Sequence, residues 1–275
     1  MAADSRVWFV TGSSRGFGRS FVAAALARGD RVAATARGLG SLADLVEANS
    51  EAILPLRLDV TDKEAVGAAV KAAYAHFGRL DIVVNNAGYG LVGAVEELDE
   101  QAIRGQLETN FFGALWVTQA VLPYLREQGS GHIVQISSVS GLAAFPTLGG
   151  YNASKWALEG LSEALAQEVA SFGIAVTLVE PGLFGTDWAG SSAAHATPDP
   201  VYDQMRQAMV AMNGQAEVGD PAAAAAALLK VVDAENPPLR VLFGSQPAQV
   251  VKYIYEQRLK TWADWEPVAR QAQGS

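Results

Sequence analysis

The chain of 275 residues carries a net charge of −9, is half hydrophobic and contains no cysteine. This composition excludes a disordered chain, disulfide bonds and metal sites built on cysteine, and an acidic chain without a basic run is not expected to bind nucleic acid or a membrane. Because no linker, repeat or membrane-length apolar stretch interrupts the sequence, we expect one domain over residues 1–275, located in the cytoplasm.

Short β-rich runs alternate with helical stretches along the chain. The expected strands are Val7–Val10, Arg31–Thr35, Leu54–Asp59, Leu80–Asn85, Gly131–Ser138, Ile174–Glu180 and Leu239–Phe243. The expected helices are Ser20–Arg28, Thr61–His76, Asp99–Gln128 and Asn152–Ser171. This order predicts the α/β class, as a single-domain, Rossmann-like, doubly wound parallel sheet of about seven strands with helices on both faces. The sequence Thr61-Asp-Lys-Glu64 has capping-box spacing, which predicts that Thr61 caps a helix.

Two segments stand outside this alternation. Residues 187–220 form a long insertion between a strand and a helix, which is typical of a lid over a binding site. Residues 245–275 are expected to form a helical tail, and its aromatic residues, such as Trp262 and Trp265, are typical of an interface. Whether the tail closes the pocket or contacts a second subunit stays open at this point.

The first strand leads into the glycine-rich turn Thr11-Gly-Ser-Ser-Arg-Gly-Phe-Gly18 and then into a helix. Glycines allow the backbone to turn tightly and to approach a pyrophosphate, while the start of the helix supplies unpaired N–H groups. A helix-entry turn without a ligand is the alternative, but the position in the first strand–helix unit favours a dinucleotide.

The end of the second strand distinguishes NAD from NADP. An acidic residue there would bind the ribose 2′-hydroxyl of NAD, whereas this chain has Ala36 followed by Arg37. Arg37, together with Arg15 of the glycine turn, could bind a 2′-phosphate. The alternative interpretation is that both arginines are solvated surface residues. Because Ala36 and Arg37 stand where NAD would need an acidic residue, we predict a preference for NADP(H).

The sequence Tyr151-Asn-Ala-Ser-Lys155 places a tyrosine and a lysine on one face of the expected helix. Ser138 ends an apolar strand, at the edge where parallel sheets gather catalytic groups. A nearby lysine ammonium is expected to lower the pKa of the phenol. Tyr151 could then serve as general acid when a carbonyl is reduced, or as general base when an alcohol is oxidised.

Together these motifs resemble the short-chain dehydrogenase/reductase family, in its short single-domain branch. The matching segments are Thr11–Gly18, Asp59-Val60, Asn85-Asn-Ala-Gly88, Asn110, Ser138, Tyr151–Lys155 and Pro181-Gly-Leu-Phe-Gly-Thr186. They occur in the order and spacing of the family, strongly over residues 6 to 186 and more weakly beyond. The resemblance implies a Rossmann-like fold and an enzyme that moves a hydride between nicotinamide C4 and a CH–OH group.

The resemblance also implies roles for single residues. In the catalytic set, Tyr151 would be the acid–base, Ser138 would bind the substrate oxygen, Lys155 would hold the nicotinamide ribose, and Asn110 would hold a water that links Lys155 to solvent. The implied NADP(H) contacts are Gly12, Ser14, Arg15, Gly16, Phe17, Gly18, Arg37, Asp59, Val60, Asn86, Ala87, Gly88, Tyr151, Lys155, Pro181, Gly182, Phe184 and Thr186. Family members commonly form homodimers or homotetramers through their long helices, here about 99–128 and 152–171.

Some of these residues have structural interpretations as well. Asp59 could end a strand rather than contact adenine, and Asn86 could join neighbouring strands rather than touch the substrate. His195 in the lid is interpreted as a surface residue, and the three histidines lack metal-ligand spacing, so we expect no metal site.

The substrate side of the site is expected to be apolar. Candidate pocket residues are Tyr89, Leu142, Phe145, Phe184, Trp188 and the stripe Tyr202, Met205, Met209 and Met212. The stripe could contact the substrate or simply pack the lid on the core. Apart from Arg206, these segments contain no basic residue that could anchor an anionic substrate. We therefore expect a hydrophobic ketone or a secondary alcohol as the substrate.

Three other functions compete with an NADP(H)-dependent oxidoreductase. A non-catalytic dinucleotide-sensing protein would not need the complete set of Asn110, Ser138, Tyr151 and Lys155. An NAD-linked alcohol or hydroxysteroid dehydrogenase is disfavoured by Ala36 and Arg37. A nucleotide-sugar epimerase is disfavoured by the glycine spacing of this chain.

Overall fold

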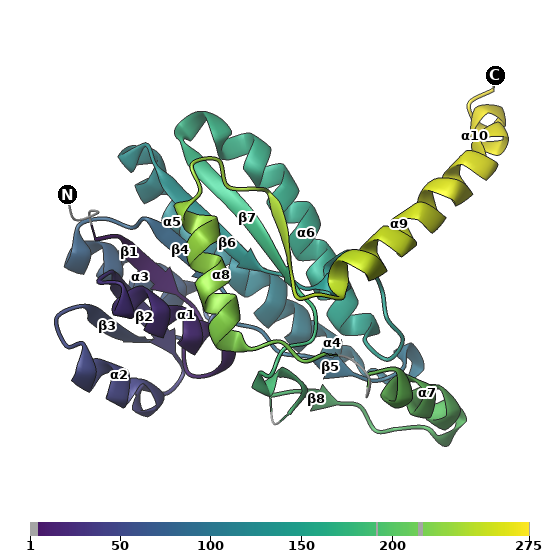
Figure 1. The fold of residues 1–275 in the computed structure, drawn as a ribbon, viewed down its shortest axis with the longest axis horizontal. Coiled ribbons are helices and arrows are strands. Elements are labelled where there is room, and N and C mark those ends of the chain that lie inside the picture. Colours follow the sequence, from purple (N-terminus) through teal and green to yellow (C-terminus); the bar gives the residue numbers. More distant parts are fainter. Residues whose placement is uncertain (1–4, 191, 214–216, 275) are drawn as a thin grey trace.

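The computed structural model describes residues 5–190, 192–213 and 217–274, and it confirms the predicted fold (Figure 1). Seven parallel strands form one sheet in the order β3-β2-β1-β4-β6-β7-β9. Their bounds are β1 Val7–Val10, β2 Arg31–Ala36, β3 Ile53–Arg57, β4 Ile82–Asn85, β6 Gly131–Ile136, β7 Ile174–Pro181 and β9 Arg240–Phe243. The strand order reverses between β1 and β4, so a crevice opens at the carboxyl ends of these strands.

Helices cover both faces of the sheet. On one face lie α1 (Gly16–Ala27), α2 (Ala43–Ala48) and α8 (Pro221–Asp233), and on the other lie α3 (Lys63–Phe77), α5 (Gly113–Gln128) and α6 (Gly149–Val169). The alternation of side chains along β1 supplies both cores: Trp8 packs with the α1 and α8 side, and Phe9 packs with the α3, α5 and α6 side. All four residues of β1 are buried, as expected for a strand covered twice.

The helix boundaries follow from local chemistry, with one correction. Gly29 adopts φ +92° directly after α1, as the predicted stop requires. The N-cap of α3 is Asp62, whose side chain accepts from the Ala65 amide at 2.9 Å. The prediction that Thr61 caps this helix was wrong, because the Thr61 hydroxyl donates to Asp59 instead.

The stretch expected as one helix over 99–128 is divided into three parts. Helix α4 (Glu100–Leu107) is followed by a π-helical turn (Glu108–Phe112) and then by α5. Two further features were not predicted: the short strands β5 (Leu91–Val92) and β8 (Ala194–His195) form a second, two-stranded sheet. This small sheet fastens the start of the 187–220 segment, which continues into α7 (Asp203–Asn213).

The chain ends in two helices that leave the body of the molecule, α9 (Pro247–Asp264) and α10 (Glu266–Ala272) (Figure 1). They follow the last strand of the sheet and lie within residues 245–275, where the sequence predicts a helical tail. Within the described residues, no helix combines the length and the apolar character that a bilayer span requires.

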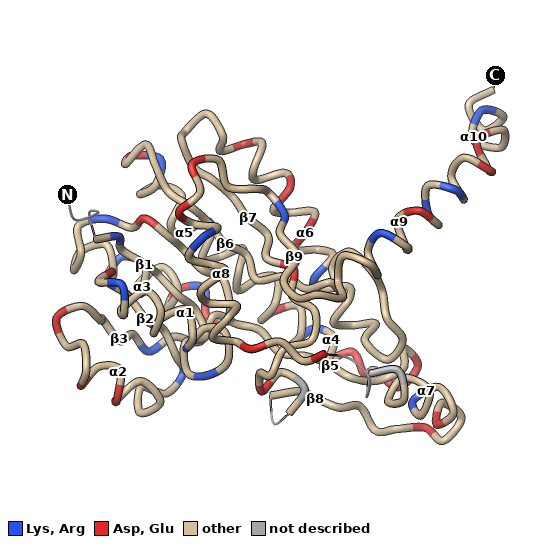
Figure 2. The backbone as a smooth tube through the Cα atoms, viewed as in Figure 1, with Lys and Arg blue, Asp and Glu red and all other residues tan. Residues whose placement is uncertain are grey.

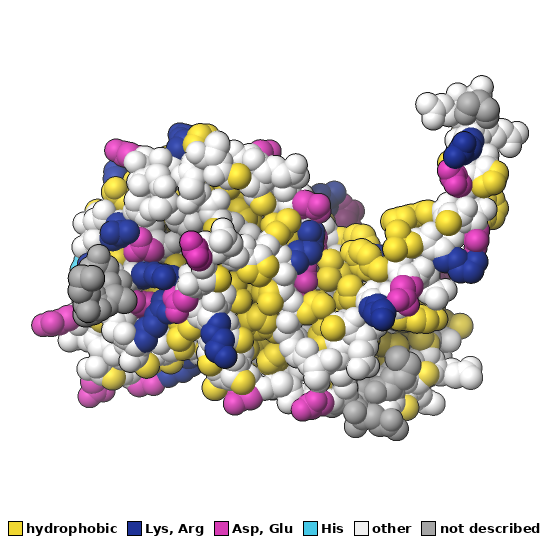
Figure 3. Space-filling model, turned by 45° about the horizontal axis from the view of Figure 1, so that its top comes forward, with side chains coloured by type: hydrophobic (Ala, Val, Ile, Leu, Met, Phe, Trp, Pro, Cys, Tyr) yellow, Lys and Arg dark blue, Asp and Glu magenta, His cyan; other side chains and the backbone are white. Residues whose placement is uncertain are grey.

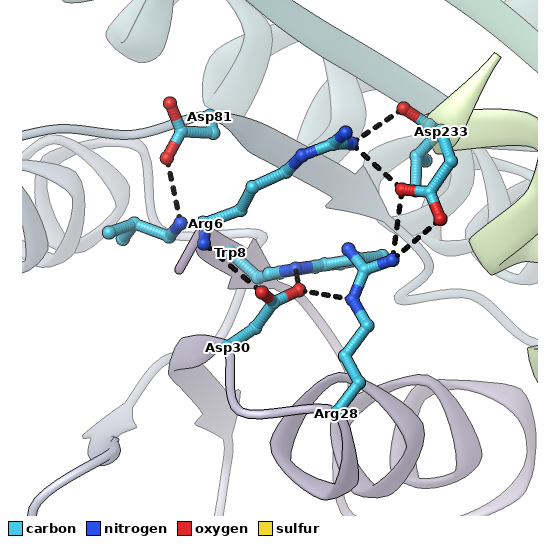
Figure 4. A network of polar contacts seen from close by, with 8 residues as sticks. Arg6, Trp8, Arg28, Asp30, Asp81 and Asp233 are labelled. Carbon is cyan, nitrogen blue, oxygen red and sulfur yellow. Dashed lines mark hydrogen bonds and ion pairs between the residues drawn. The ribbon is translucent and has the colours of Figure 1, made fainter. Parts of the chain in front are cut away.

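A polar network joins the amino ends of three strands (Figure 4). Asp30 is its centre: one carboxylate oxygen accepts from the Arg6 amide, and the other accepts from Trp8 Nε1 at 2.7 Å and from Arg28 Nε at 2.6 Å. Arg28 also pairs with Asp233 at the end of α8. The network therefore ties β1 and β2 to the helix that covers them.

Candidate active site

One cavity of about 1560 Å³ opens at the carboxyl ends of the strands. It is lined by the glycine turn, the ends of β2, β4 and β6, the start of α6 and the segment after β7. The predicted site residues that line it are Gly12, Ser14, Arg15, Gly16, Phe17, Arg37, Asp59, Val60, Asn86, Ala87, Gly88, Ser138, Tyr151, Lys155, Pro181, Gly182, Phe184 and Thr186. Gly18 and Asn110 do not line it, and both lie behind residues that do.

The glycine turn is held by contacts that leave no room for side chains. Gly12 and Gly16 adopt positive φ, and a Cβ at Gly18 would lie 2.3 Å from the Gly12 carbonyl oxygen. The side-chain Nδ2 of Asn86 donates to the Thr11 and Gly12 carbonyls, at 2.9 and 3.1 Å, so the interpretation of Asn86 as a link between neighbouring strands matches these contacts. The N-cap residue of α1, Arg15, makes no side-chain capping hydrogen bond, and the start of a helix presents amide groups that suit an anionic ligand.

The two arginines predicted to bind a 2′-phosphate have different surroundings. Arg37 follows β2, is exposed and lines the cavity. Arg15 makes an ion pair with Asp187 at 2.5 Å, which joins the glycine turn to the segment after β7. Asp59 lies two residues beyond the end of β3, accepts from the amide and the hydroxyl of Thr61, and lines the cavity.

Tyr151 lies at the floor of the cavity and is only 5% exposed. Its burial raises the pKa of the phenol to about 12, while contacts with Ser138 and the Trp188 indole nitrogen act in the opposite direction. The Trp188 ring centre lies 4.9 Å from that of Tyr151. The expected lowering of this pKa is therefore wrong for this structure, because removal from water outweighs the stabilisation of the phenolate.

Lys155 lies one turn further along α6, with Nζ 5.7 Å from the centre of the Tyr151 ring. The ammonium donates to the Ile136 carbonyl at 2.8 Å. Burial lowers its pKa to about 8, and the nearby carboxylate of Glu159 partly opposes this shift. A Cβ on Gly88 would come within 3.8 Å of Nζ, so the glycine keeps the space beside the ammonium open.

Asn110 occupies the π-helical turn, which the sequence did not indicate. Its Oδ1 accepts from the Tyr89 amide at 3.0 Å, and its Nδ2 donates to the Tyr89 carbonyl and to Ser154 Oγ, at 3.0 and 3.1 Å. A π-helical turn adds one residue to a helix and reorients the side chains on it, and such turns are frequent at functional sites. Here it places Asn110 directly behind Gly88.

Two buried carboxylates beside this site were missed by the sequence analysis. Glu159 and Glu180 share the Arg240 guanidinium, with N–O distances of 3.1 and 3.4 Å. Burial and the neighbouring Glu159 raise the pKa of Glu180 to about 8, while Arg240 opposes this. The signal was present, since Glu180 is the one charged residue of the predicted strand Ile174–Glu180.

The segment 187–220, which the sequence predicts to be a lid, makes polar contacts with the body of the molecule. The Tyr202 hydroxyl donates to Glu96, and Arg206 pairs with Glu97 at 2.6 Å. Met209 lines the cavity, whereas Tyr202 and Met205 do not, so the predicted stripe divides between attachment and cavity wall. The side chain of Met212 lies outside the described residues. His195 is exposed on β8.

The remaining wall of the cavity is largely aromatic. Tyr89, Phe145, Phe184 and Trp188 line it, and Leu142 of the expected set does not. Phe184 packs edge-on against Phe17 of the glycine turn, with 5.0 Å between ring centres. The cavity therefore combines a glycine cradle, a tyrosine–lysine pair and an apolar side.

Comparison with known proteins accounts for this combination. The family model of the short chain dehydrogenases matches residues 6–197. The chain belongs to this family. Within the family, it is 46% identical to the oxidoreductase BOA17 of Botryotinia fuckeliana over 244 residues, which is 87% of this chain and 89% of that protein.

Solved structures of the family show the same fold. A short-chain dehydrogenase from Streptomyces avermitilis matches with a TM-score of 0.93 and 40% identity, covering 99% of this chain and 100% of that one. A short-chain dehydrogenase from Burkholderia cenocepacia, in complex with NADP, matches with a TM-score of 0.77 and 26% identity, covering 94% of this chain and 97% of that one. This chain is therefore an oxidoreductase of a family whose members bind nicotinamide dinucleotides.

Proposed function

We propose that this protein is an NADP(H)-dependent oxidoreductase that interconverts a carbonyl and a secondary alcohol on a hydrophobic small molecule. The observation that carries the proposal is the position of Tyr151, Ser138 and Lys155 on one cavity, next to a glycine cradle. The glycine turn supports a dinucleotide because it packs too closely for side chains, with a Cβ at Gly12 2.9 Å from Ala87 Cα, and such turns let the backbone approach a pyrophosphate.

NADP(H) would be held by residues from several loops. Gly12, Gly16 and the open start of α1 suit the pyrophosphate, Arg37 suits the 2′-phosphate, and Lys155 suits the nicotinamide ribose. Bound there, the nicotinamide supplies the hydride that the reduction consumes.

Side chains of the protein would supply the proton that the carbonyl oxygen takes up during reduction. A phenol with a pKa of about 12 is protonated at neutral pH, so Tyr151 is ready to donate its proton to the carbonyl oxygen of the substrate. Ser138 would donate a hydrogen bond to the same oxygen. The Lys155 ammonium would stabilise the phenolate that remains.

The substrate class follows from the cavity wall. Tyr89, Phe145, Trp188 and Met209 offer apolar and aromatic surface. The only basic residue of the lid helix, Arg206, is already paired with Glu97 and Asp203, so it does not supply an anchor for a charged substrate. An apolar ketone therefore suits the cavity better than a carboxylated or phosphorylated one.

The proposal is tested by following nicotinamide absorbance with a panel of apolar ketones and either NADPH or NADH. We expect turnover with NADPH and a loss of the preference for NADPH in Arg37→Asp. Arg57→Asp, at the end of the neighbouring strand, is the matched control and should keep the preference. Equal turnover with NADH, unchanged in Arg37→Asp, would contradict the choice of cofactor.

A further inference from the structure

Trp188 lies on the segment after β7 and packs against the ring of Tyr151, with 4.9 Å between the ring centres and an angle of 57° between the ring planes. Both residues line the cavity. The indole nitrogen Nε1 is buried, and within the described residues its N–H has no hydrogen-bond partner. A buried donor without a partner costs stability, so its presence in a fold requires an explanation, such as a catalytic role.

The indole nitrogen faces the hydroxyl end of Tyr151. Burial raises the pKa of this phenol, and the Ser138 hydroxyl and the Trp188 indole nitrogen are the two groups that oppose the rise. Both groups therefore lie near the phenol oxygen, because a polar side chain stabilises a phenolate only at close range. Nε1 and the phenol oxygen are thus neighbours that do not bond to each other, and one acceptor atom of a ligand can reach both.

Three contacts hold Trp188 in this place. Gly90 leaves room for the indole, since a Cβ on Gly90 would lie 2.8 Å from Trp188 Cζ2. The Gly90 carbonyl accepts from the Ala194 amide at 2.8 Å, at the small sheet of β5 and β8. Asp187 pairs with Arg15 of the glycine turn at 2.5 Å. Packing and polar contacts thus give the indole a defined orientation, which a group that takes part in a reaction needs.

The surroundings of the indole are mostly apolar. The sequence between Asp187 and Asp199 contains no charged residue, and Figure 2 shows β8 without charge. Pro247 and Val250, at the start of α9, also line the cavity, and Figure 3 shows hydrophobic side chains gathered where α9 leaves the body. An apolar ligand therefore meets compatible surface here, while its oxygen depends on the polar groups around Tyr151.

Three donors around one oxygen suit an alkoxide better than a ketone. A carbonyl oxygen has two lone pairs, which three donors must share. When a hydride adds to the carbonyl carbon, the π electron pair of the C=O bond moves to the oxygen, which then has three lone pairs. One of them takes the proton of Tyr151, and the other two accept hydrogen bonds, of which the Ser138 hydroxyl supplies one. A further donor is therefore bonded most strongly as negative charge develops on the oxygen.

We propose that Trp188 Nε1 donates the second of these hydrogen bonds, which makes Trp188 a catalytic residue of the reaction. The inference rests on the proposed function, because it requires a substrate oxygen beside Tyr151. A donor that binds the developing charge more strongly than the ketone lowers the barrier, whereas a donor that binds both equally does not. In other enzymes, removal of one such donor lowers kcat by about 100- to 1,000-fold.

Trp188→Phe tests this role, since it keeps an aromatic ring against Tyr151 and removes the N–H. With NADPH and the panel of apolar ketones, kcat should fall by about 100-fold, while KM should change less than about threefold. NADPH affinity, measured by fluorescence titration, should stay within about threefold of wild type. Trp116→Phe is the matched control, because Trp116 is a half-buried indole on α5 that does not line the cavity, and its turnover should equal that of wild type.

Nuclear magnetic resonance of the indole N–H groups tests the hydrogen bond without turnover. The signal of Trp188 is the one that Trp188→Phe lacks. Oxidised NADP cannot reduce a ketone, so acetophenone remains intact when it is added to the wild-type protein with the oxidised cofactor. The Trp188 signal should move downfield with acetophenone, whose oxygen is an acceptor. It should not do so with α-methylstyrene, which has nearly the same shape and no oxygen.

Turnover of Trp188→Phe within tenfold of wild type would overturn the proposal, as would a Trp188 signal that moves equally with both ligands or with neither. A loss of NADPH affinity in Trp188→Phe as large as the loss of turnover would also overturn it, because the N–H would then serve the cofactor. A wild type that reduces no ketone would reject the proposed function itself. An active wild type with a fully active Trp188→Phe would reject only the role of Trp188.

Gly90→Ala is a second variant, and it keeps the indole. Its new Cβ would lie 2.8 Å from Trp188 Cζ2, so the ring must move away from Tyr151 or along it. We expect kcat to fall by about tenfold or more, with NADPH affinity unchanged, because a donor displaced by a fraction of its bond length no longer reaches the oxygen. Full turnover in Gly90→Ala would contradict the proposed position of the indole.

Discussion

The two edges of the same sheet use their polar residues in opposite ways. At the amino edge, Asp30 has a partner for each carboxylate oxygen and joins two strands and two helices (Figure 4). At the carboxyl edge, Glu180 Oε1 has only an ion pair of 3.4 Å with Arg240, and within the described residues Glu159 Oε1 and Trp188 Nε1 lack hydrogen-bond partners. The same fold thus satisfies its polar groups at one edge and keeps incompletely satisfied, buried groups at the other, where Trp188 lines the cavity.

The pKa shifts follow the same division. At the carboxyl edge, burial raises the pKa of Tyr151 and lowers that of Lys155, and these two groups lie side by side on α6. A buried group with a shifted pKa costs stability, and such groups persist where they serve chemistry. Changes at the carboxyl edge should therefore affect function, and changes at the amino edge should affect stability.

The largest effect is expected from Tyr151→Phe. This change removes the only proton donor that the proposal places at the substrate oxygen, so turnover should fall by about 1,000-fold. NADPH affinity, measured by fluorescence titration, should change less than about threefold. Turnover that stays within tenfold of wild type would show that another group donates the proton.

At the opposite edge, Asp30→Ala is expected to lower the free energy of unfolding by about 3 kcal/mol, because it leaves Trp8 Nε1 and the Arg28 guanidinium without their partner. Urea unfolding measures this change. The exposed Glu51→Ala is the control and should stay within about 0.5 kcal/mol. Turnover of the folded Asp30→Ala protein should equal that of wild type, and a large loss would contradict the separation of the two edges.

A single methyl group at the glycine turn should weaken NADPH binding by about 100-fold. In Gly18→Ala the new Cβ would lie 2.3 Å from the Gly12 carbonyl oxygen, so the turn must move. Gly67→Ala on α3 is the matched control, since no atom lies within 4 Å of its Cβ position. Isothermal titration separates the two variants, and unchanged affinity in Gly18→Ala would refute the cradle.

The smallest effect concerns the pH dependence of stability. The carboxyl of Glu180 has a pKa of about 8 in the fold against an ordinary value of 4.5, so the folded chain binds a proton that the unfolded chain releases between these pH values. The contribution of Glu180 to the free energy of unfolding should therefore fall as pH rises from 4.5 to 8, by on the order of 1–2 kcal/mol, whereas the buried His132, with its pKa lowered to about 4, contributes in the opposite direction below pH 6.5.

Glu180→Gln should flatten this pH dependence, as measured by urea unfolding at a series of pH values. Glu163→Gln is the matched control, because Glu163 also contacts Arg240 but lies exposed on the surface. A pH dependence that survives in Glu180→Gln, or disappears in Glu163→Gln, would place the proton elsewhere.

The sequence was sufficient to predict the parallel sheet, and most of the residues that it proposed for the site line one cavity at the carboxyl edge of that sheet. The strands are continuous apolar runs, and motifs such as Tyr151–Lys155 occur at strand and helix ends that the fold must bring to one edge. The preference of glycine for a positive φ at the end of a helix also predicted that α1 ends before Gly29.

The features that the sequence did not predict depend on contacts between residues that are far apart in the chain. The pairing of Arg15 with Asp187 spans most of the chain. The π-helical turn at Asn110 was not indicated by the local sequence, which predicted one continuous helix over 99–128. The pKa of Tyr151 was expected to be lowered because the lysine was counted without the burial, which only a packed structure reveals.

The most direct test of the contrast between the two edges is the stabilisation by NADPH of wild type, Asp30→Ala and Gly18→Ala. At 100 times the dissociation constant, bound NADPH should add about 2.7 kcal/mol to the free energy of unfolding of wild type. We predict the same increment in Asp30→Ala, since the edges are independent, and almost none in Gly18→Ala at the same concentration. Equal stabilisation of Gly18→Ala, or no stabilisation of wild type, would contradict the account.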